Sequence, residues 1–458
     1  MLSPTTYNQR RQQLCEQLDT GLVLLLGHGD AARNAAGNTY PFRQDSTFLY
    51  YFGLHQPHRA ALLDIDAGTT CLFGDDPSAE EIVWTGPVAM IAELGDRVGV
   101  TATAPRAELI EQIKTAHQQG RAIHLLPTYR SETVLTLQQL FGDTLPEPSA
   151  ALIKAVVAQR SVKSEEEVAQ IEIALDISAQ MHSYAMRATQ PGLREQEIVN
   201  SLASIACLGG LEASFTTIFS VHGETLHNSV YRNLMHEGDI IVHDSGVESD
   251  LGYASDITRT FPVSGSFTPE QRDLYGIVLD MQQQAIKAVR PNVPFRDIHR
   301  LAATVLMQGL KDLGVTRGNM DDAVDAGAHN LFYPHGLGHM LGLDVHDMEA
   351  LGENYVGYSD TVKRDERFGW NRLRFARELE PGFVITVEPG LYFIPALIDK
   401  WQAENKLADF INYDKVNNLR NARGIRIEDD VLVTPDGNRV LGPSIPKTIV
   451  DVEAACQM

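Results

Sequence analysis

Acidic residues stand at the ends of four apolar, strand-like runs of this sequence. They are Asp244 after DIIVH, Asp256 before ITRTF, Glu388 after FVITV and Glu428 after GIRI. A carboxylate in such surroundings costs several kcal/mol unless it is paired or bound to a cation. A single one is as often a paired structural acid, but four of them need a common counter-charge. A metal is the simplest counter-charge, so these residues predict a metal site.

Three histidines follow one another closely in HGLGHMLGLDVHD (335–347), namely His335, His339 and His346. The glycines between them disfavour a helix, so the two-histidine helix face of zinc metalloproteases does not apply. Glycine instead lets the backbone approach a site closely. Four carboxylates and one imidazole suit two divalent ions that accept oxygen-rich ligands, such as Mn²⁺. A structural zinc site would require thiolates or a closed set of four ligands.

The segments that carry these residues predict an α+β C-terminal half. Four strand-like pieces hold the carboxylates: GDIIVHDSG, GYASDITRTFPVSG, GFVITVEPGLYF and GIRIEDDVLVT. Helices are expected at 161–192, where Ser164 and Glu167 form a capping box, at 268–289 after an N-cap and a proline, and at 295–314. These elements would hold the carboxylates rigidly.

The N-terminal half alternates strand and helix patterns, which predicts an α/β layer. Strands are expected within 21–30 and 59–76, a helix at 107–120 and a further strand at 121–127. We place the domain boundary before the helix that begins at Ser164. The expected domains are therefore 1–160 and 161–458.

Charge and composition exclude several classes of function. The 458 residues carry a formal net charge of −22, which repels phosphate backbones and argues against nucleic-acid binding. We expect no signal peptide and no membrane association, because the N-terminus lacks an apolar segment and no long apolar run occurs. The four cysteines lack close pairs, which argues against a disulfide framework and favours the cytoplasm.

These motifs resemble the proline-specific metallopeptidases of the pita-bread fold, which include aminopeptidase P and prolidase. The resemblance rests on HDSG…YASDITRTFP, HGLGHMLGLDVHD, TVEPGLYF and GIRIEDDVLVT. In the N-terminal half, YPFRQDSTFLYYFGL (40–54) is similar to the N-terminal domain of aminopeptidase P. The expected fold is thus a C-terminal pita-bread catalytic domain with an α/β creatinase-like N-terminal domain.

The resemblance implies a role for each candidate site residue. Five residues would bind two Mn²⁺ ions, with Asp256 and Glu428 shared between them: Asp244, Asp256, His339, Glu388 and Glu428. Five more would line or support the substrate site: His227, His335, His346, Tyr392 and Arg426. The family also implies a homodimer or larger assembly.

The implied reaction is metal-assisted hydrolysis of an Xaa-Pro amide bond, with release of the N-terminal residue. Glu388 would also move a proton toward the proline nitrogen, and His346 would stabilise the oxyanion. A non-catalytic binding module, or an enzyme of this fold that hydrolyses creatine or phosphotriesters, is the alternative. The intact ligand set argues against the binding module and against creatine hydrolysis, which needs no metal.

Two features resemble prolidase rather than aminopeptidase P. One is the forty-position separation of Glu388 and Glu428 (428 − 388), and the other is Arg374 in LRFAR. By resemblance, Arg374 would bind the free carboxylate of a dipeptide; otherwise it is a solvated surface arginine. We expect an Xaa-Pro aminopeptidase, with a prolidase restricted to dipeptides as the alternative. Phe215 stands where relatives often have tyrosine, so a hydroxyl near a metal carboxylate is expected to be missing.

Overall fold

The computed structural model describes residues 1–142 and 145–457. The chain forms two compact units. The N-terminal unit comprises Met1–Arg160 and Met348–Tyr355, and the C-terminal unit comprises Ser161–Asp347 and Val356–Met458. Among the described residues, no helix combines the length and the apolar character that crossing a membrane requires.

A five-stranded sheet forms the centre of the N-terminal unit, with the strand order β6-β5-β4-β1-β7. The β1–β4 and β4–β5 pairs are antiparallel, whereas β1–β7 and β5–β6 are parallel. The strands of the unit are β1 (Leu22–Leu26), β2 (Ala32–Ala35), β3 (Asn38–Thr39), β4 (Ala60–Asp64), β5 (Thr69–Phe73), β6 (Ala102–Ala104) and β7 (Ile123–His124). The mixed sheet agrees with the expected α/β layer, although β7 covers only part of the strand expected at 121–127.

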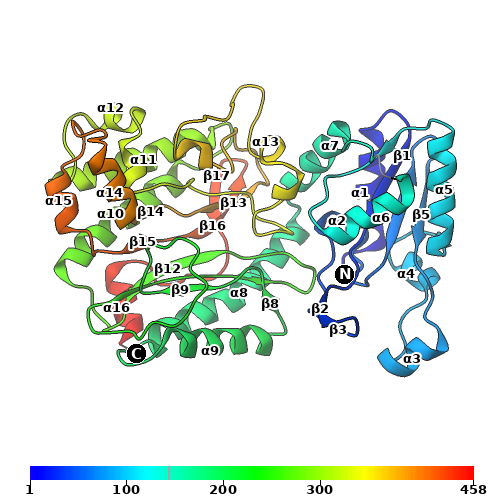
Figure 1. The fold of residues 1–458 in the computed structure, drawn as a ribbon, viewed down its shortest axis with the longest axis horizontal. Coiled ribbons are helices and arrows are strands. Elements are labelled where there is room, and N and C mark those ends of the chain that lie inside the picture. The colour runs from blue at the N-terminus through cyan, green and yellow to red at the C-terminus, as the bar shows by residue number, and fades with distance from the viewer. Residues whose placement is uncertain (143–144, 458) are drawn as a thin grey trace. The chain divides into compact units, whose positions relative to one another are not determined.

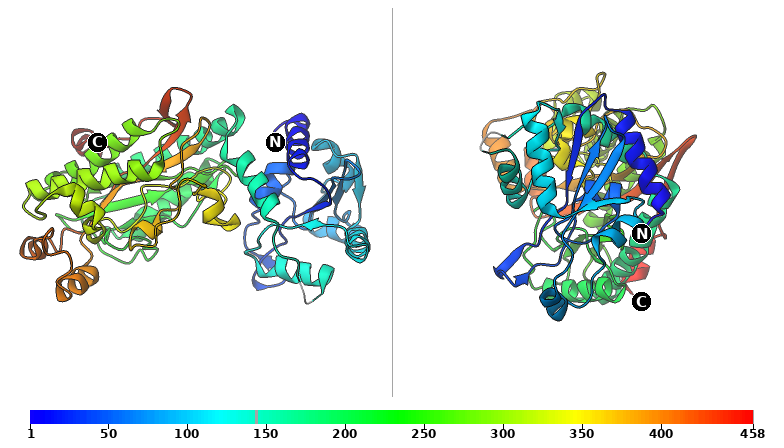
Figure 2. Two further views of the ribbon diagram at one scale, coloured as in Figure 1. Left: turned by 90° about the horizontal axis from the view of Figure 1, so that it is seen from above. Right: turned by 90° about the vertical axis from the view of Figure 1, so that its right-hand side faces the viewer.

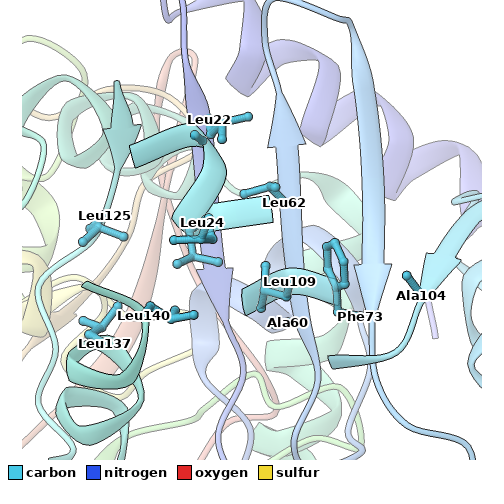
Figure 3. Packing of buried hydrophobic residues seen from close by; sticks show 12 residues of the cluster. Leu22, Leu24, Ala60, Leu62, Phe73, Ala104, Leu109, Leu125, Leu137 and Leu140 are labelled. Atoms are coloured by element: carbon cyan, nitrogen blue, oxygen red, sulfur yellow. The ribbon is translucent and has the colours of Figure 1, made fainter. Parts of the chain in front are cut away.

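Helices cover both faces of this sheet, with α1 and α5 on opposite sides (Figure 2). The helices of the unit are α1 (Pro4–Glu16), α2 (Ser46–Phe52), α3 (Ala79–Thr85), α4 (Ile91–Arg97), α5 (Arg106–Gln118), α6 (Ser131–Phe141) and α7 (Ala150–Ser161). Alternate strand residues such as Leu22, Leu24 and Leu62 pack against Leu109 of α5 and Leu137 of α6 (Figure 3). This period of two is what a sheet buried by helices requires.

Several small antiparallel sheets build the C-terminal unit. Their orders are β12-β10-β9, β11-β8, β13-β16-β17 and β14-β15. The strands are β8 (Glu212–Ala213), β9 (Ile218–Ser220), β10 (Ile240–Ser245), β11 (Val247–Glu248), β12 (Ile257–Pro262), β13 (Val384–Val387), β14 (Gly390–Tyr392), β15 (Gly424–Arg426), β16 (Asp429–Thr434) and β17 (Gly437–Val440).

Two helix pairs pack on these sheets (Figure 1). Helix α8 contacts β10, β11 and β12 and pairs with α9, whereas α10 contacts β13, β14 and β15 and pairs with α11. The helices are α8 (Glu165–Ala188), α9 (Glu195–Leu208), α10 (Pro269–Ala288), α11 (Phe295–Asp312), α12 (Met320–Asp325), α13 (Glu353–Val356), α14 (Pro395–Ala403), α15 (Tyr413–Asn418) and α16 (Ile449–Cys456), with 3-10 turns at Ala328–Leu331, Glu349–Leu351 and Trp370–Arg372. A helix pair packed on strands thus occurs twice, which gives the α+β architecture expected from the sequence.

Local capping explains where the long helices begin. The Ser164 side chain accepts a hydrogen bond from the Glu167 backbone, and the Glu167 side chain accepts one from the Ser164 backbone. Thr268 and Gln271 form the same reciprocal pair at the start of α10. Each pair satisfies two backbone donors that a helix start otherwise leaves unbonded. The two N-termini predicted from the sequence are therefore confirmed.

Candidate metal centre and substrate site

The first two carboxylates lie on neighbouring strands. Asp244 is in β10, directly opposite Thr258 of β12, and Asp256 immediately precedes β12. Both are buried, at 8% and 5% exposure. Oδ1 of each has no hydrogen-bond partner within the described residues. Such orphaned, buried oxygens are available to a cation.

The structure fixes the orientation of the His339 imidazole. Its Nδ1 lies 3.0 Å from the Met340 carbonyl oxygen, which can only accept, so Nδ1 carries the proton. Nε2 is then an acceptor, 3.4 Å from Asp256 Oδ2 and 3.6 Å from Glu388 Oε1. The His339 backbone bonds to Thr386 of β13 in both directions. An oriented acceptor nitrogen facing two carboxylates is the arrangement that a metal ligand requires.

The two glutamates complete the cluster: Glu388 directly follows β13, and Glu428 lies between β15 and β16. The Glu388 backbone N–H donates to the Leu337 carbonyl at 2.8 Å, and that of Glu428 donates to the Thr258 carbonyl at 3.0 Å. The Thr258 hydroxyl donates to Glu428 Oε2 at 2.7 Å, while Glu428 Oε1 has no partner in the described part of the chain. Ligand atoms of Asp256, His339 and Glu428 lie within 4.8 Å of one another.

Electrostatics show that this cluster holds more negative than positive charge. Burial, followed by the charge of Asp244, raises the pKa of Asp256 well above its usual range. Burial, followed by the charge of Asp256, does the same to the pKa of Glu428, and burial also raises the pKa of Glu388. Carboxylates that repel one another in a buried site need a multivalent cation to ionise at neutral pH. The donor set, one imidazole and several carboxylate oxygens, fits oxygen-preferring divalent ions.

Arg426 connects the carboxylates to the predicted substrate residues. Its guanidinium donates to Asp244 Oδ2 at 2.6 Å, to the Tyr392 hydroxyl at 2.9 Å and to the Thr258 hydroxyl at 3.1 Å. Its three donor nitrogens thus fix three side chains at once. The sequence led us to expect only that Arg426 supports the active site beside Glu428, and these contacts name the side chains that it holds.

His335 is neutral and oriented by two hydrogen bonds. Its Nδ1 donates to the Gly336 carbonyl at 2.8 Å, so its Nε2 accepts from the Tyr392 hydroxyl at 2.9 Å. Burial, followed by the positive charge of Arg426, lowers the pKa of His335 to about 3. Burial raises the pKa of Tyr392 to about 12. Both groups therefore remain uncharged throughout the neutral range.

The remaining predicted residues lie on loops, within electrostatic or ring contact of the same centre. The rings of His339 and His346 meet edge to face, with centroids 4.3 Å apart. His227 lies on an exposed loop, and partial burial, then Arg426, then Arg374, lower the pKa of its imidazole. Arg374 also acts on Glu388: burial is the main cause of the raised Glu388 pKa, and Arg374 opposes it. The structure thus brings all of the predicted site residues together within the C-terminal unit.

Sequence reasoning missed two residues, Thr258 and Asp430. The Thr258 hydroxyl bridges Arg426 and Glu428, and Asp430 Oδ2 accepts the Asp256 backbone N–H at 3.1 Å. Side chains alternate between the two faces of a β-strand, so residues two positions apart share a face. Thr258 is two residues after Asp256, and Asp430 is two residues after Glu428, so this spacing could have indicated both. Phe215 has no hydroxyl to offer a metal carboxylate, but the Thr258 hydroxyl donates to one carboxylate of the cluster, that of Glu428.

Comparison with known proteins shows the family of this chain. Residues 169–435 match the model of metallopeptidase family M24, and residues 7–124 match that of the aminopeptidase P N-terminal domain. Xaa-Pro dipeptidase of Homo sapiens is 31% identical over 97% of this chain and 92% of its own length. Xaa-Pro aminopeptidase of Escherichia coli (strain K12) is 30% identical over 99% and 98%.

Solved structures agree with these matches. A variant of E. coli aminopeptidase P in complex with substrate superposes with a TM-score of 0.82 at 29% identity, covering 100% of this chain and 98% of that one. Pseudomonas aeruginosa aminopeptidase PepP gives 0.82 at 28%, with the same coverage. These findings confirm the resemblance and the two-domain fold expected from the motifs. Since one family model spans more than half of its length, the chain belongs to metallopeptidase family M24.

Proposed function

We propose that this protein is a dinuclear metal-dependent exopeptidase that hydrolyses the Xaa-Pro bond and releases the N-terminal residue. The observation that carries the proposal is the convergence of three buried carboxylates, the partly exposed Glu388 and the oriented His339 nitrogen, with three carboxylate oxygens left without partners among the described residues. The relatives named Xaa-Pro aminopeptidase and Xaa-Pro dipeptidase support the choice of bond.

Five side chains would hold the metal ions, which we propose to be two Mn²⁺. Asp256 and Glu428 would be shared, since their ligand atoms lie together with that of His339 and each has an oxygen that no described residue contacts by a hydrogen bond. Asp244 and Glu388 would complete the set. When bound, two such ions supply Lewis acidity and generate a nucleophile from water at neutral pH.

The protein's own groups would orient the substrate and move protons. Glu388, whose side chain is 19% exposed, is the carboxylate of the cluster most open to a substrate, so we assign proton transfer toward the proline nitrogen to it. His346, beside His339, would donate to the oxyanion. Arg426, Tyr392 and His335 form a chain of hydrogen bonds that would hold the site rigid.

Proline specificity follows from the chemistry of the bond. A proline nitrogen in a peptide carries no hydrogen and fixes its backbone angle, so peptidases that recognise an N–H donor fail on it. A pocket shaped for the ring selects this bond. We propose that His227, on the exposed loop, contacts the substrate at the entrance to the site.

A prolidase restricted to dipeptides is the second candidate, and the position of Arg374 favours it. Its guanidinium lies within electrostatic range of both Glu388 and His227. Its backbone packs closely on the histidine loop: a Cβ added at Gly336 would lie 3.2 Å from the Leu373 Cα and 3.7 Å from the Arg374 nitrogen. The fork of an arginine so placed suits a free proline carboxylate.

The two candidates predict different substrate profiles. Metal-free enzyme would be reconstituted with Mn²⁺ and assayed on Ala-Pro, Ala-Pro-Ala and, as a control, Ala-Ala-Ala. Release of alanine from both proline peptides but not from the control is expected. Activity on the dipeptide alone would favour the prolidase, whereas no metal-dependent cleavage of either proline peptide would refute the proposal.

We also propose that the enzyme acts in the cytoplasm as a homodimer or larger assembly. The four cysteines are free thiols, which suits a reducing compartment. The oligomeric state rests on the family resemblance alone. Light scattering at working concentration tests it, and a fully active monomer would overturn it.

A further inference from the structure

An ion pair between Lys163 and Asp347 is buried in the C-terminal unit. Lys163 Nζ lies 2.9 Å from Asp347 Oδ2, and each side chain is 1% exposed. A buried ion pair seldom stabilises a fold more than apolar residues of the same volume would, because both charges lose their hydration. The directional contacts of such a pair can nevertheless fix the position of the loops that carry its two residues.

Asp347 closes the loop that carries His346. Its backbone N–H donates to the Met340 carbonyl at 2.9 Å, and its Oδ1 accepts from the Asp344 backbone N–H. The ion pair fills the inside of this loop: a Cβ at Gly342 would lie 2.5 Å from Asp347 Oδ2 and 3.0 Å from Lys163 Cε. The loop therefore has room for the pair only because residue 342 is glycine.

The two histidines of this loop are held by different means. His339 is fixed by backbone bonds to Thr386, and the neighbouring Leu341 N–H donates to the Val384 carbonyl. His346 lies five residues beyond that pairing with β13 and directly before Asp347. Its backbone continues directly into Asp347, whose N–H and carboxylate hold this side of the loop.

Lys163 is itself anchored near the same strand. Its backbone N–H donates to the Gly382 carbonyl at 2.8 Å, two residues before β13 begins. The ammonium group therefore projects from a fixed point into the His346 loop. We propose that Lys163 is a positioning residue that holds Asp347 and thereby sets the His346 imidazole for catalysis. This inference rests on the proposed function, in which His346 contacts the reacting carbonyl.

The deciding variant is the double substitution Lys163→Met with Asp347→Asn. Lys163→Met alone strands a buried carboxylate and is expected to fold poorly. The double variant removes both charges, and the asparagine oxygen can still accept from the Asp344 backbone. Because small misplacement of a catalytic group costs up to about a hundredfold in rate, we expect kcat on Ala-Pro-Ala to fall about tenfold to a hundredfold. KM, Mn²⁺ content and the thermal midpoint should stay near wild-type values.

A matched control is the ion pair of Arg439 and Glu172 on the surface of the same unit. Its double variant, Arg439→Met with Glu172→Gln, should leave kcat unchanged. The imidazole NMR signal of His346, assigned with His346→Gln in zinc-loaded enzyme, provides a readout independent of turnover and should shift only in the Lys163 variant. If the wild-type enzyme proves inactive on Xaa-Pro peptides, the proposed function fails while this signal still tests the positioning. A folded Lys163 double variant with an unchanged His346 signal, or with wild-type kcat, would overturn the inference.

Discussion

Replacing Arg374 by alanine offers the sharpest test of substrate length. A dipeptide ends in a free proline carboxylate, whereas in a longer peptide that carbon forms an amide. If Arg374 binds the carboxylate, only the dipeptide gains the charge-assisted contact. We therefore expect Arg374→Ala to lower kcat/KM for Ala-Pro more than for Ala-Pro-Ala.

The size of the effect follows from the structure. Arg374 is half-buried and its guanidinium influences the pKa values of Glu388 and His227, although burial is the main cause of both shifts. A hydrogen bond to a charged group in such a site is worth about 1.5–3 kcal/mol. At about 1.4 kcal/mol for each factor of ten, the selective loss should be roughly tenfold to a hundredfold.

Hydrogen bonds of the neighbouring backbone should keep the segment around residue 374 in place in the Arg374→Ala variant. The Tyr358 hydroxyl donates to the Leu373 carbonyl at 2.6 Å, and the Ala376 N–H donates to the Gly357 carbonyl at 2.8 Å. Removing the Arg374 side chain should therefore leave the segment in place. Arg372→Ala is the control, because Arg372 is exposed and two residues away. Equal losses on both peptides, or losses matched by Arg372→Ala, would refute a carboxylate-binding role.

Three further predictions concern the metal centre and pH. Asp256→Ala should abolish activity and lower the Mn²⁺ content measured by elemental analysis, and retention of both would contradict its assignment as a shared ligand. His339→Ala should lose metal, whereas His346→Ala should keep it and lose turnover; the reverse pattern in metal stoichiometry would show the ligand to be wrong. His299 and His329 are fully buried, and burial lowers the pKa of His299 to about 3. Since the unfolded imidazole binds a proton near pH 6.5, the stability that neutral His299 contributes is complete above that pH and falls as pH drops from 6.5 toward 3, by about 2 kcal/mol between pH 7 and 5. Burial also lowers the pKa of His329, which acts in the same direction. Urea unfolding at both pH values should show a smaller difference for His299→Leu than for the wild type, and an equal difference would contradict the buried, neutral state.

Much of the site could be predicted because its residues are of types that a buried strand end does not normally contain. A carboxylate at the end of an apolar strand, as at Asp244 or Glu388, conflicts with the core that the strand otherwise builds, and a bound cation resolves the conflict. The helix starts at Ser164 and Thr268 were equally accessible, since capping depends on residues only three positions apart.

The contacts that the sequence did not reveal are long-range. Arg426 donates hydrogen bonds to Asp244 and Thr258, which are 182 and 168 positions away in the sequence. No local sequence pattern could therefore predict these contacts. Lys163 and Asp347 are 184 positions apart, and each looks like an ordinary surface charge in its own segment. Strand alternation could have indicated Thr258, but only once Asp256 was known to face the site.

Burial links these observations physically. The strands that orient Asp256 and Glu428 also exclude water, and this exclusion raises the pKa of both carboxyl groups above their usual range. Positive charge must then come from within the fold or from bound metal. Arg426 supplies part of it to Asp244, while unpartnered oxygens remain on Asp244, Asp256 and Glu428 among the described residues. A single guanidinium cannot neutralise the four carboxylates of the cluster, so the protein's own charges leave an excess of negative charge that the two divalent ions proposed for this site would offset.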